Sequence, residues 1–286
     1  MQLTMGNVRI LRIARYAGAV ALSVALIACE TVQTTQGGVV GIDRSQRMAL
    51  SSQEVDASAR TEYAKVIAEQ NAKGALNRDA AQVRRIRAIA NRLIAQTAAF
   101  RPDAVQWKWE VNLITSPEVN AWCMPGGKIA VYTGLIDKLN LTDDELAAVM
   151  GHEIAHALRE HARERASEQA VAGTLISLGS AILGAGELGQ QGMQYAYMGL
   201  LGLPNSRLHE TEADRIGVEL AARAGYDPRA AIALWQKMAQ AGGSEPMPFM
   251  STHPSRESRM TDLTDYSARV MPLYEQSKKS KGAGRP

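Results

Sequence analysis

The most informative residues of this chain are His152 and His156, which stand four positions apart in the sequence HEIAH. Side chains four residues apart lie on one face of an α-helix, so the two imidazoles can bind the same metal ion. Glu153 lies between them and would sit beside a water molecule on that metal. This pattern is typical of a hydrolase in which a metal activates water and a glutamate takes the proton.

A catalytic zinc ion takes three protein ligands and keeps one position open, so a third ligand is needed. The metzincin arrangement, with a third histidine six residues after the second, is excluded because Ala162 occupies that position. His161 would lie on another face of a continuing helix, and we expect it to be solvated at the surface. Glu210 and Asp214 share a later helix face. Spacing alone does not decide which binds zinc and which orients a histidine.

The HEIAH motif lies inside a predicted helix. Thr142, followed three residues later by Glu145, is the signature of a capping box, and apolar residues then recur at helical spacing to about Ala166. Helical spacing also recurs in five other segments, residues 51–73, 78–99, 208–224, 228–241 and 256–274. We therefore expect an α+β fold that is mainly helical.

A small β-sheet is predicted beside the HEIAH helix. Residues 105–114 alternate apolar and polar side chains, and a second strand follows the turn at Pro125-Gly-Gly. We expect this second strand to offer its edge to an extended polypeptide substrate. The alternative is that it only packs on the helix, and the two are compatible. Its residues are Lys128, Ile129, Ala130, Val131 and Tyr132.

The N-terminus has the pattern of a bacterial secretory signal. Three arginines precede an uncharged run from Tyr16 to Ile27, and the sequence Leu-Ile-Ala-Cys ending at Cys29 resembles a lipobox. We therefore expect residues 1–28 to be a signal peptide and Cys29 to carry lipid. The alternative is an ordinary signal peptide followed by an incidental cysteine. By the lipoprotein sorting rule known from enteric bacteria, Glu30 rather than aspartate after the cysteine favours the outer membrane over the inner membrane.

Removal of that segment also removes three arginines and no acid, so the formal charge falls from +3 to zero. The basic composition is then no argument for nucleic acid binding, and we expect none. Residues 29–46 lack a helical period and are interpreted as a lipidated tether. The folded domain is expected at 47–276, followed by a disordered basic tail at 277–286.

Residues 171–204 form an apolar, glycine-rich insert in which Glu187 is the only charged residue. Two interpretations are open. The insert forms either a pair of buried or loosely packed helices beside the active site, or a surface that dips into lipid or contacts a membrane partner. The glycines and Glu187 argue against a transmembrane helix.

The motifs together resemble peptidase family M48, a family of zinc metallopeptidases. The resemblance rests on HEIAH, on Glu210-Thr-Glu-Ala-Asp214 about fifty residues later, and on Asn120-Ala and Pro125-Gly-Gly upstream. It covers about residues 50–270 and is greatest to single-domain lipoprotein and mitochondrial inner-membrane members. It implies a zincin-like core, one Zn²⁺ per chain, Glu210 as the third ligand and Asp214 behind a ligating histidine.

His253, in the sequence Thr-His-Pro, is a further candidate. In repeat-bearing M48 members a histidine in a similar loop can occupy the open zinc position, so the resemblance implies a removable fourth ligand, or latch. Two other roles remain open: His253 could bind the tetrahedral intermediate or cap the last helix. Arg207 and Arg259 are possible partners of an oxyanion or a carboxylate, although surface salt bridges are the simpler expectation.

The function that follows is a zinc metalloendopeptidase of the bacterial cell envelope, lipid-anchored and facing the periplasm. We expect its substrates to be extended chains of misfolded or outer-membrane proteins, and its partners to include the outer-membrane assembly machinery. An envelope assembly factor or chaperone with latent or rare proteolysis is the alternative function. Degradation of casein that is lost with a chelator and restored by zinc would distinguish the two.

Overall fold

The computed structural model describes residues 29–241, 248–253 and 257–283, and the predicted signal peptide lies outside these ranges. The chain is a mainly helical α+β protein, as the sequence predicts. It divides into two compact units. The large unit comprises Gln33–Arg44, Gln53–Ala162 and the chain from Leu208 onward; the small unit comprises residues up to Val32, Ser45–Ser52 and Arg163–Arg207.

The large unit contains a three-stranded sheet of β3 (Glu110–Ile114), β4 (Ala121–Met124) and β5 (Lys128–Tyr132). β5 lies in the centre, parallel to β3 and antiparallel to β4. The expectation that Lys128–Tyr132 offers an edge to substrate is therefore wrong, because both of its sides are already hydrogen-bonded. Within the described chain, β4 pairs with β5 alone and is the edge strand beside it.

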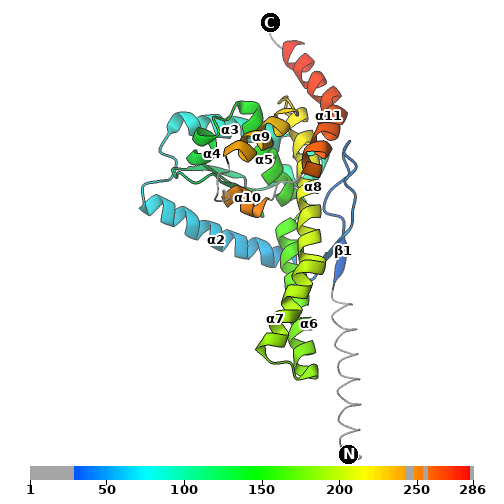
Figure 1. Ribbon diagram of the computed structural model, residues 1–286. Coiled ribbons are helices and arrows are strands. Elements are labelled where there is room, and N and C mark those ends of the chain that lie inside the picture. Colours follow the sequence, from blue (N-terminus) through cyan, green and yellow to red (C-terminus); the bar gives the residue numbers. More distant parts are fainter. Residues whose placement is uncertain (1–28, 242–247, 254–256, 284–286) are drawn as a thin grey trace, which may run out of the picture. The chain divides into compact units, whose positions relative to one another are not determined.

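Helices cover both faces of this sheet (Figure 1). Val111 and Leu113 of β3 belong to the main core, together with side chains of α3 (Ala80–Ile94) and α5 (Asp143–Leu158). Asn112, which alternates with them, points to α2 (Ser52–Ala72), where its amide donates to the Tyr63 hydroxyl at 2.6 Å. The sheet thus separates α2 from the helix that carries HEIAH.

α5 is the central helix of the large unit. Its capping box forms as predicted: Thr142 Oγ1 accepts from the Glu145 amide, and the Glu145 carboxylate accepts from the Thr142 amide at 2.8 Å. Every residue from Glu145 to Leu158 is buried. A helix buried on all sides cannot leave its polar side chains to bulk water, so the surroundings of His152, Glu153 and His156 are set by groups inside the protein.

Two glycines bring α5 against α8 (Leu203–Arg223). A Cβ atom on Gly151 would lie 2.9 Å from the Gly217 carbonyl oxygen, and one on Gly217 would lie 2.8 Å from the His152 amide nitrogen. Only glycine at both positions allows the two backbones to approach this closely. The crossing lies next to His152 and places the acidic residues of α8 beside the histidines of α5.

α5 does not continue to Ala166, and this prediction was wrong. The helix ends at Leu158, Glu160 takes a left-handed conformation with φ of 50°, and α6 (His161–Leu183) begins directly afterwards. Arg101 stabilises the break by donating to the Leu158 carbonyl and to the Glu160 carboxylate at 2.6 Å. Glutamate stands where glycine is usual, so the sequence carried no signal for this break.

The segment before residue 47 was expected to be a free tether, but part of it is packed into the large unit. Val40 and Ile42 are buried in the main core of the large unit. The Val40 amide donates to Glu219 at 2.9 Å, and the Gln36 amide donates to the Phe100 carbonyl at 2.7 Å. The folded domain therefore begins well before residue 47, with a segment that has no regular period.

The remaining elements of the large unit surround this core. The predicted helices at 51–73, 78–99, 208–224 and 228–241 are present within a few residues of their expected ends. The last helix is longer than predicted, and the expected disordered tail is helical up to Ala283. The bounds are η1 (Thr97–Ala99), η2 (Pro102–Gln106), α4 (Thr133–Lys138), α9 (Ala230–Ala241), α10 (Pro248–Thr252) and α11 (Glu257–Ala283).

The small unit is a helical hairpin with a two-stranded ribbon. β1 (Glu30–Val32) pairs with β2 (Gln46–Met48), and Leu50 binds α6 through Arg163 and Ser167. α6 and α7 (Glu187–Tyr197) form the arms, joined by a turn, and a π-helix (Met198–Gly202) leads from α7 into α8. In the described chain no helix is long and apolar enough to cross a membrane. None of the residues of α7 is buried, so a buried helix pair is excluded for that arm.

Candidate metal centre and active site

The two histidines of HEIAH converge as their spacing predicts. His152 and His156 come from successive turns of α5, and their Nε2 atoms lie 3.1 Å apart. The two rings meet edge to face with centroids 4.7 Å apart. Both side chains are buried, so the polar atoms that face each other are shielded from bulk water.

Glu210 of α8 completes the group. One carboxylate oxygen lies 3.4 Å from His152 Nε2 and the other lies 3.4 Å from His156 Nε2. Spacing alone had left Glu210 and Asp214 equivalent, and the structure separates them, since only Glu210 faces both Nε2 atoms. Burial would raise the pKa of Glu210, but its hydrogen bonds with His152 and His253 outweigh burial and lower that pKa. Glu210 is therefore a carboxylate.

Asp214 lies behind His152, one turn further along α8. Its Oδ1 atom is 3.0 Å from His152 Nδ1. A carboxylate can only accept here, so Nδ1 carries the proton and Nε2 is directed at the group of donors. Hydrogen bonds from Arg259 to both oxygens of Asp214 fix the carboxylate. Arg259 is buried, so the expected surface salt bridge is wrong for this residue.

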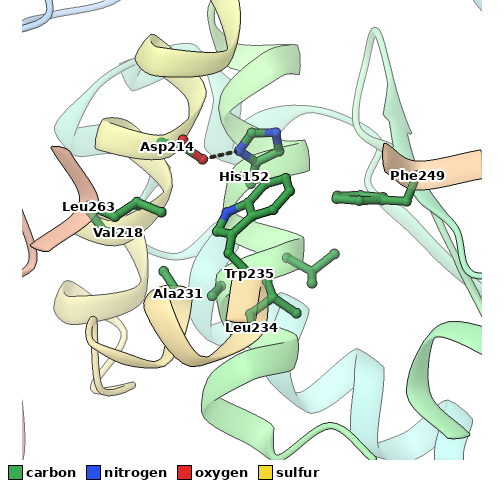
Figure 2. A pocket seen from close by; sticks show the side chains of 10 residues that line it. His152, Asp214, Val218, Ala231, Leu234, Trp235, Phe249 and Leu263 are labelled. Atoms are coloured by element: carbon green, nitrogen blue, oxygen red, sulfur yellow. Dashed lines mark hydrogen bonds and ion pairs between the residues drawn. The ribbon is translucent and has the colours of Figure 1, made fainter. Parts of the chain in front are cut away.

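Figure 2 shows the apolar side chains around the His152–Asp214 hydrogen bond. The His152 ring lies between Asp214 and the ring of Phe249, and Trp235 lies beside it. The Arg259 guanidinium stacks over the Trp235 ring at 3.9 Å. These side chains exclude water from the His152–Asp214 hydrogen bond, which strengthens it.

The donor atoms fit a zinc ion. Tetrahedral zinc with ligand bonds of about 2.0–2.1 Å holds its donor atoms about 3.3 Å apart. The two Nε2 atoms lie 3.1 Å apart, and each lies 3.4 Å from a different oxygen of Glu210. His152, His156, Glu210 and His253 each supply one donor atom, and these four atoms lie within 4.8 Å of one another.

The pKa values of the two histidines are pushed in opposite directions. Burial lowers the pKa of His152, but its hydrogen bonds with Asp214 and Glu210 outweigh burial and raise the value to about 9. Burial and the neighbouring His152 lower the pKa of His156 well below its usual value. The two buried histidines therefore favour one positive charge between them and disfavour a second. One metal cation bound by both rings would supply that charge.

His161 was expected at the surface, but it is fully buried. Because α5 ends at Leu158, His161 starts a new helix and turns back toward the site. Its Nδ1 atom lies 2.8 Å from His156 Nδ1, and its Nε2 atom lies 3.0 Å from Glu212. Burial lowers the pKa of His161 to about 3, so it is neutral. Sequence reasoning missed this residue because it assumed an unbroken helix.

Glu153 lies on the same turn of α5 as His152. Its Oε1 atom is buried and has no hydrogen-bond partner among the described residues, although His253 Nε2 lies 3.4 Å away. Burial raises the pKa of Glu153 above its usual value. A buried carboxylate with an unused acceptor and a raised pKa is suited to take a proton from a bound water molecule.

His253 reaches into the site from the end of α10. Its Nδ1 atom lies 2.9 Å from Glu210 and 3.2 Å from His152 Nε2. The backbone amide of Phe249, at the start of α10, donates to the Val119 carbonyl just before β4. The sequence-predicted residues His152, Glu153, His156, Glu210, Asp214 and His253 are thus brought together, whereas Cys29 belongs to the small unit.

Cys123 of β4 is near this site but is not an activated nucleophile. Burial, reinforced by the charge of Glu153, raises the pKa of the Cys123 thiol well above its usual value. The reactive form of cysteine is the thiolate, which this environment disfavours.

A helix with two histidines and a glutamate, and a third ligand from a glutamate on a second helix, defines the gluzincin class of metallopeptidase sites. A model of "Peptidase family M48" matches residues 80–267, which is more than half of the chain. The chain therefore belongs to peptidase family M48.

Named relatives come from mitochondria and from bacteria. The chain is 38% identical over 161 residues to "Mitochondrial metalloendopeptidase OMA1" of Schizosaccharomyces pombe, covering 56% of this chain and 47% of that protein. For the protein of that name in Saccharomyces cerevisiae the values are 32% over 178 residues, with 59% and 50% covered. It is 28% identical over 198 residues to "Beta-barrel assembly-enhancing protease" of Yersinia pestis, covering 65% and 39%. The chain thus spans half or less of these relatives.

Proposed function

We propose that the protein is a zinc-dependent endopeptidase that hydrolyses extended segments of polypeptide. The observation that carries this proposal is the convergence of His152, His156 and Glu210 at separations that fit one zinc ion, with Glu153 beside them. The names of the relatives, which include metalloendopeptidases and a protease, support the same activity.

The reaction needs no covalent intermediate. When bound, zinc would polarise a water molecule and a substrate carbonyl. Glu153 then takes a proton from the attacking water and delivers it to the nitrogen of the leaving amine. Asp214 and Arg259 hold His152 in one orientation while this happens. Phe249 and Trp235 keep water away from that hydrogen bond.

An extended substrate would pair with β4, which takes the place of the strand first predicted. β4 is the edge strand beside β5, and it packs against α5, the helix of the site. Backbone pairing binds a chain without selecting its sequence, because every residue offers the same amide and carbonyl. This mode of binding suits a protease that acts on misfolded proteins.

His253 is proposed as a removable fourth ligand. Its contacts with Glu210, His152 and Glu153 support this role, because a substrate carbonyl or a water molecule would have to approach the same donor atoms. His253→Ala should therefore raise peptidase activity. Lower activity would instead indicate that His253 binds the tetrahedral intermediate, and unchanged activity would leave it only a structural role at the end of α10.

The setting that we propose is the bacterial cell envelope, with Cys29 carrying lipid and the protein facing the periplasm from the outer membrane. The lipobox-like sequence ending at Cys29 supports this setting. So does the similarity to a protein named for assembly of β-barrels. The proposed substrates are misfolded or outer-membrane proteins, and the outer-membrane assembly machinery is the proposed partner. Metabolic labelling with a lipid precursor, in wild type and in Cys29→Ser, tests the anchor.

Casein hydrolysis tests the activity. The purified protein should degrade casein, lose this activity with a chelator and regain it with zinc, and Glu153→Gln should be inactive with its zinc retained. A protein that binds unfolded chains but leaves casein intact, even after His253→Ala, would instead be the chaperone-like assembly factor. Comparing the proteins trapped by Glu153→Gln with those bound by wild type would identify natural substrates.

A further inference from the structure

His161 and Glu212 form a buried chain of hydrogen bonds behind His156 to which the proposed reaction assigns no role. His156 Nδ1 lies 2.8 Å from His161 Nδ1, and His161 Nε2 lies 3.0 Å from Glu212 Oε2. His161 is 0% exposed and Glu212 is 2% exposed. Each of the two distances is that of a hydrogen bond.

The direction of these hydrogen bonds follows from the role of His156. Its Nε2 atom faces His152 and Glu210 and must offer a lone pair to a metal, so its Nδ1 atom carries the proton and donates. His161 Nδ1 then accepts, which leaves the His161 proton on Nε2. That proton is donated to Glu212, which as a carboxylate can only accept. One tautomer of each ring satisfies the whole chain.

Glu212 is itself held in place. Arg44 donates to both of its oxygens, at 2.7 and 3.2 Å, and Arg159 donates to Oε2 at 3.0 Å. Arg159 is fully buried and also donates to the Arg44 carbonyl at 3.1 Å. The chain of hydrogen bonds therefore ends on residues 33–44, which pack into the large unit.

We propose that His161 is a positioning residue that holds His156 in its metal-binding tautomer, with Glu212 fixing the tautomer of His161. This inference rests on the proposed zinc site. It gives the second histidine of HEIAH an outer partner that matches the one Asp214 provides for the first. An outer partner of a metal-binding histidine typically contributes about 10–100-fold in metal affinity.

Zinc affinity, measured by competition with a chromophoric chelator, tests the proposal without relying on activity. His161→Phe keeps a ring of similar size and removes both nitrogens, and its dissociation constant for zinc should rise by about 10–100-fold. His161→Gln keeps one acceptor and one donor and should recover part of the loss. The absorption spectrum of the Co²⁺-substituted protein should change in His161→Phe, because the orientation of His156 changes.

His209→Phe is the matched control, since His209 is buried and stacks on His161 with centroids 4.3 Å apart. It should leave zinc affinity unchanged. The proposed role of His161 would be overturned if His161→Phe bound zinc as tightly as wild type, or if His209→Phe lost as much zinc affinity as His161→Phe. If His161→Phe fails to fold, Glu212→Gln must weaken zinc binding for the proposal to stand. A wild-type protein that binds no zinc would instead overturn the proposed function, and the proposed role of His161 with it.

The hairpin of the small unit exposes an apolar surface. Large apolar side chains of the segment from α7 to the start of α8 are exposed, with Leu188 at 84%, Tyr195 at 76% and Leu200 at 75%. The arm packs on α6 through Met193, near Gly179, and Asn205 donates to Glu168 at 2.7 Å. The exposed side chains therefore belong to a formed hairpin.

The composition of this hairpin favours a lipid surface over a protein partner. Residues 171–206 contain one charged residue, Glu187, whereas the rim of a protein interface is polar. Charged side chains are costly to bury in a bilayer, so such a charge-poor stretch suits lipid. The chain that enters this same unit at Cys29 comes directly from the uncharged run Tyr16–Ile27, which also favours a membrane.

The geometry points to a bilayer interface as the occupant of this face, with Leu188, Tyr195, Leu200 and Leu201 entering the boundary between headgroups and acyl chains. This proposal rests on the proposed membrane setting but not on peptidase activity. Of the two interpretations of the insert, it takes the lipid-contacting surface, and a buried helix pair is excluded for the α7 arm.

Lipid-dependent quenching tests this contact in the full chain. With Cys29→Ser and Cys123→Ser, a fluorophore on Leu188→Cys should shift to the blue and be quenched by vesicles of phosphatidylethanolamine and phosphatidylglycerol that carry brominated acyl chains. Adding Leu200→Glu and Leu201→Glu should abolish the quenching. A chain that co-floats with vesicles while the probe stays unquenched would overturn the proposal. A blue shift that appears without vesicles and grows with protein concentration would assign the face to a second copy of the chain instead.

Discussion

His152 and His156 stand on successive turns of one helix, but the protein supports them in different ways. His152 donates directly to the carboxylate of Asp214, which Arg259 holds. His156 reaches a carboxylate only through a second imidazole, that of His161, and the carboxylate is Glu212. The difference shows that alternate acidic residues of α8 serve one site: Glu210 faces both histidines, Asp214 supports one and Glu212 the other.

The direct arm should be the stiffer of the two. One hydrogen bond separates His152 from a charged group, and the apolar side chains of Trp235 and Phe249 cover it. Two hydrogen bonds separate His156 from Glu212, and the far end includes Arg44, which is partly exposed. Substitutions on the direct arm (Asp214 and Arg259) should therefore lower zinc affinity more than substitutions on the indirect arm (His161 and Glu212).

The largest effect is expected where the substitution touches neither arm. Glu153→Gln removes the proton acceptor but leaves the zinc donors intact, so kcat should fall by about 10²–10⁴-fold while the zinc content stays at that of wild type. Peptide hydrolysis and metal analysis on the same preparation check both halves. Full activity in this variant would remove Glu153 from the reaction.

Asp214→Asn tests the direct arm. The amide removes the charge that pairs with Arg259 and can present its nitrogen to His152, so zinc affinity should fall by about 10–100-fold. Chelator competition measures it. Thermal unfolding of the metal-free protein is the control, because a loss of affinity without a matching loss of stability locates the defect at the metal.

Glu212→Gln tests the indirect arm. Its carboxamide oxygen can still accept from His161, so zinc affinity should fall by less than in Asp214→Asn, by about tenfold at most. The comparison of the two variants is the point of the experiment. A larger loss in Glu212→Gln than in Asp214→Asn would reverse the proposed order of the two arms.

The smallest effect is expected at the far end. Arg44→Gln removes one of the two arginines on Glu212, but Arg159 still holds the carboxylate. A partly exposed ion pair contributes about 1 kcal/mol or less, so unfolding should show only a small loss of stability and zinc affinity should change by a few-fold at most. A tenfold loss of zinc affinity in Arg44→Gln would contradict this expectation and show that residues 33–44 strongly influence the metal site.

Local patterns in the sequence predicted the parts of the site that depend on local geometry. The capping box at Thr142 and Glu145, and the shared face of His152 and His156, follow from helical periodicity. The fold class follows from the same periodicity in the flanking segments. Glu210 was preferred over Asp214 only through the family resemblance, and the structure adds the physical reason, which is the close crossing at Gly151 and Gly217.

Three of the errors concern features that distant contacts decide. The position of β5 in the centre of the sheet depends on its pairing with β3, which a hairpin signal cannot show. The helix break at Glu160 is stabilised by Arg101, far away in sequence, and without that break His161 could not be placed. Residues 33–44 have no period, and their burial depends on partners such as Glu219.

X-ray absorption at the zinc edge is the decisive test of the proposed metal site, because it reports the ligands of the bound metal. For the wild-type protein with zinc, we expect one ion per chain with only nitrogen and oxygen neighbours at about 2.0–2.2 Å, including an imidazole signal. Glu210→Ala should lose the bound ion or bind it with a changed set of neighbours. A sulfur neighbour at about 2.3 Å, or a spectrum that Glu210→Ala leaves unchanged, would contradict the account.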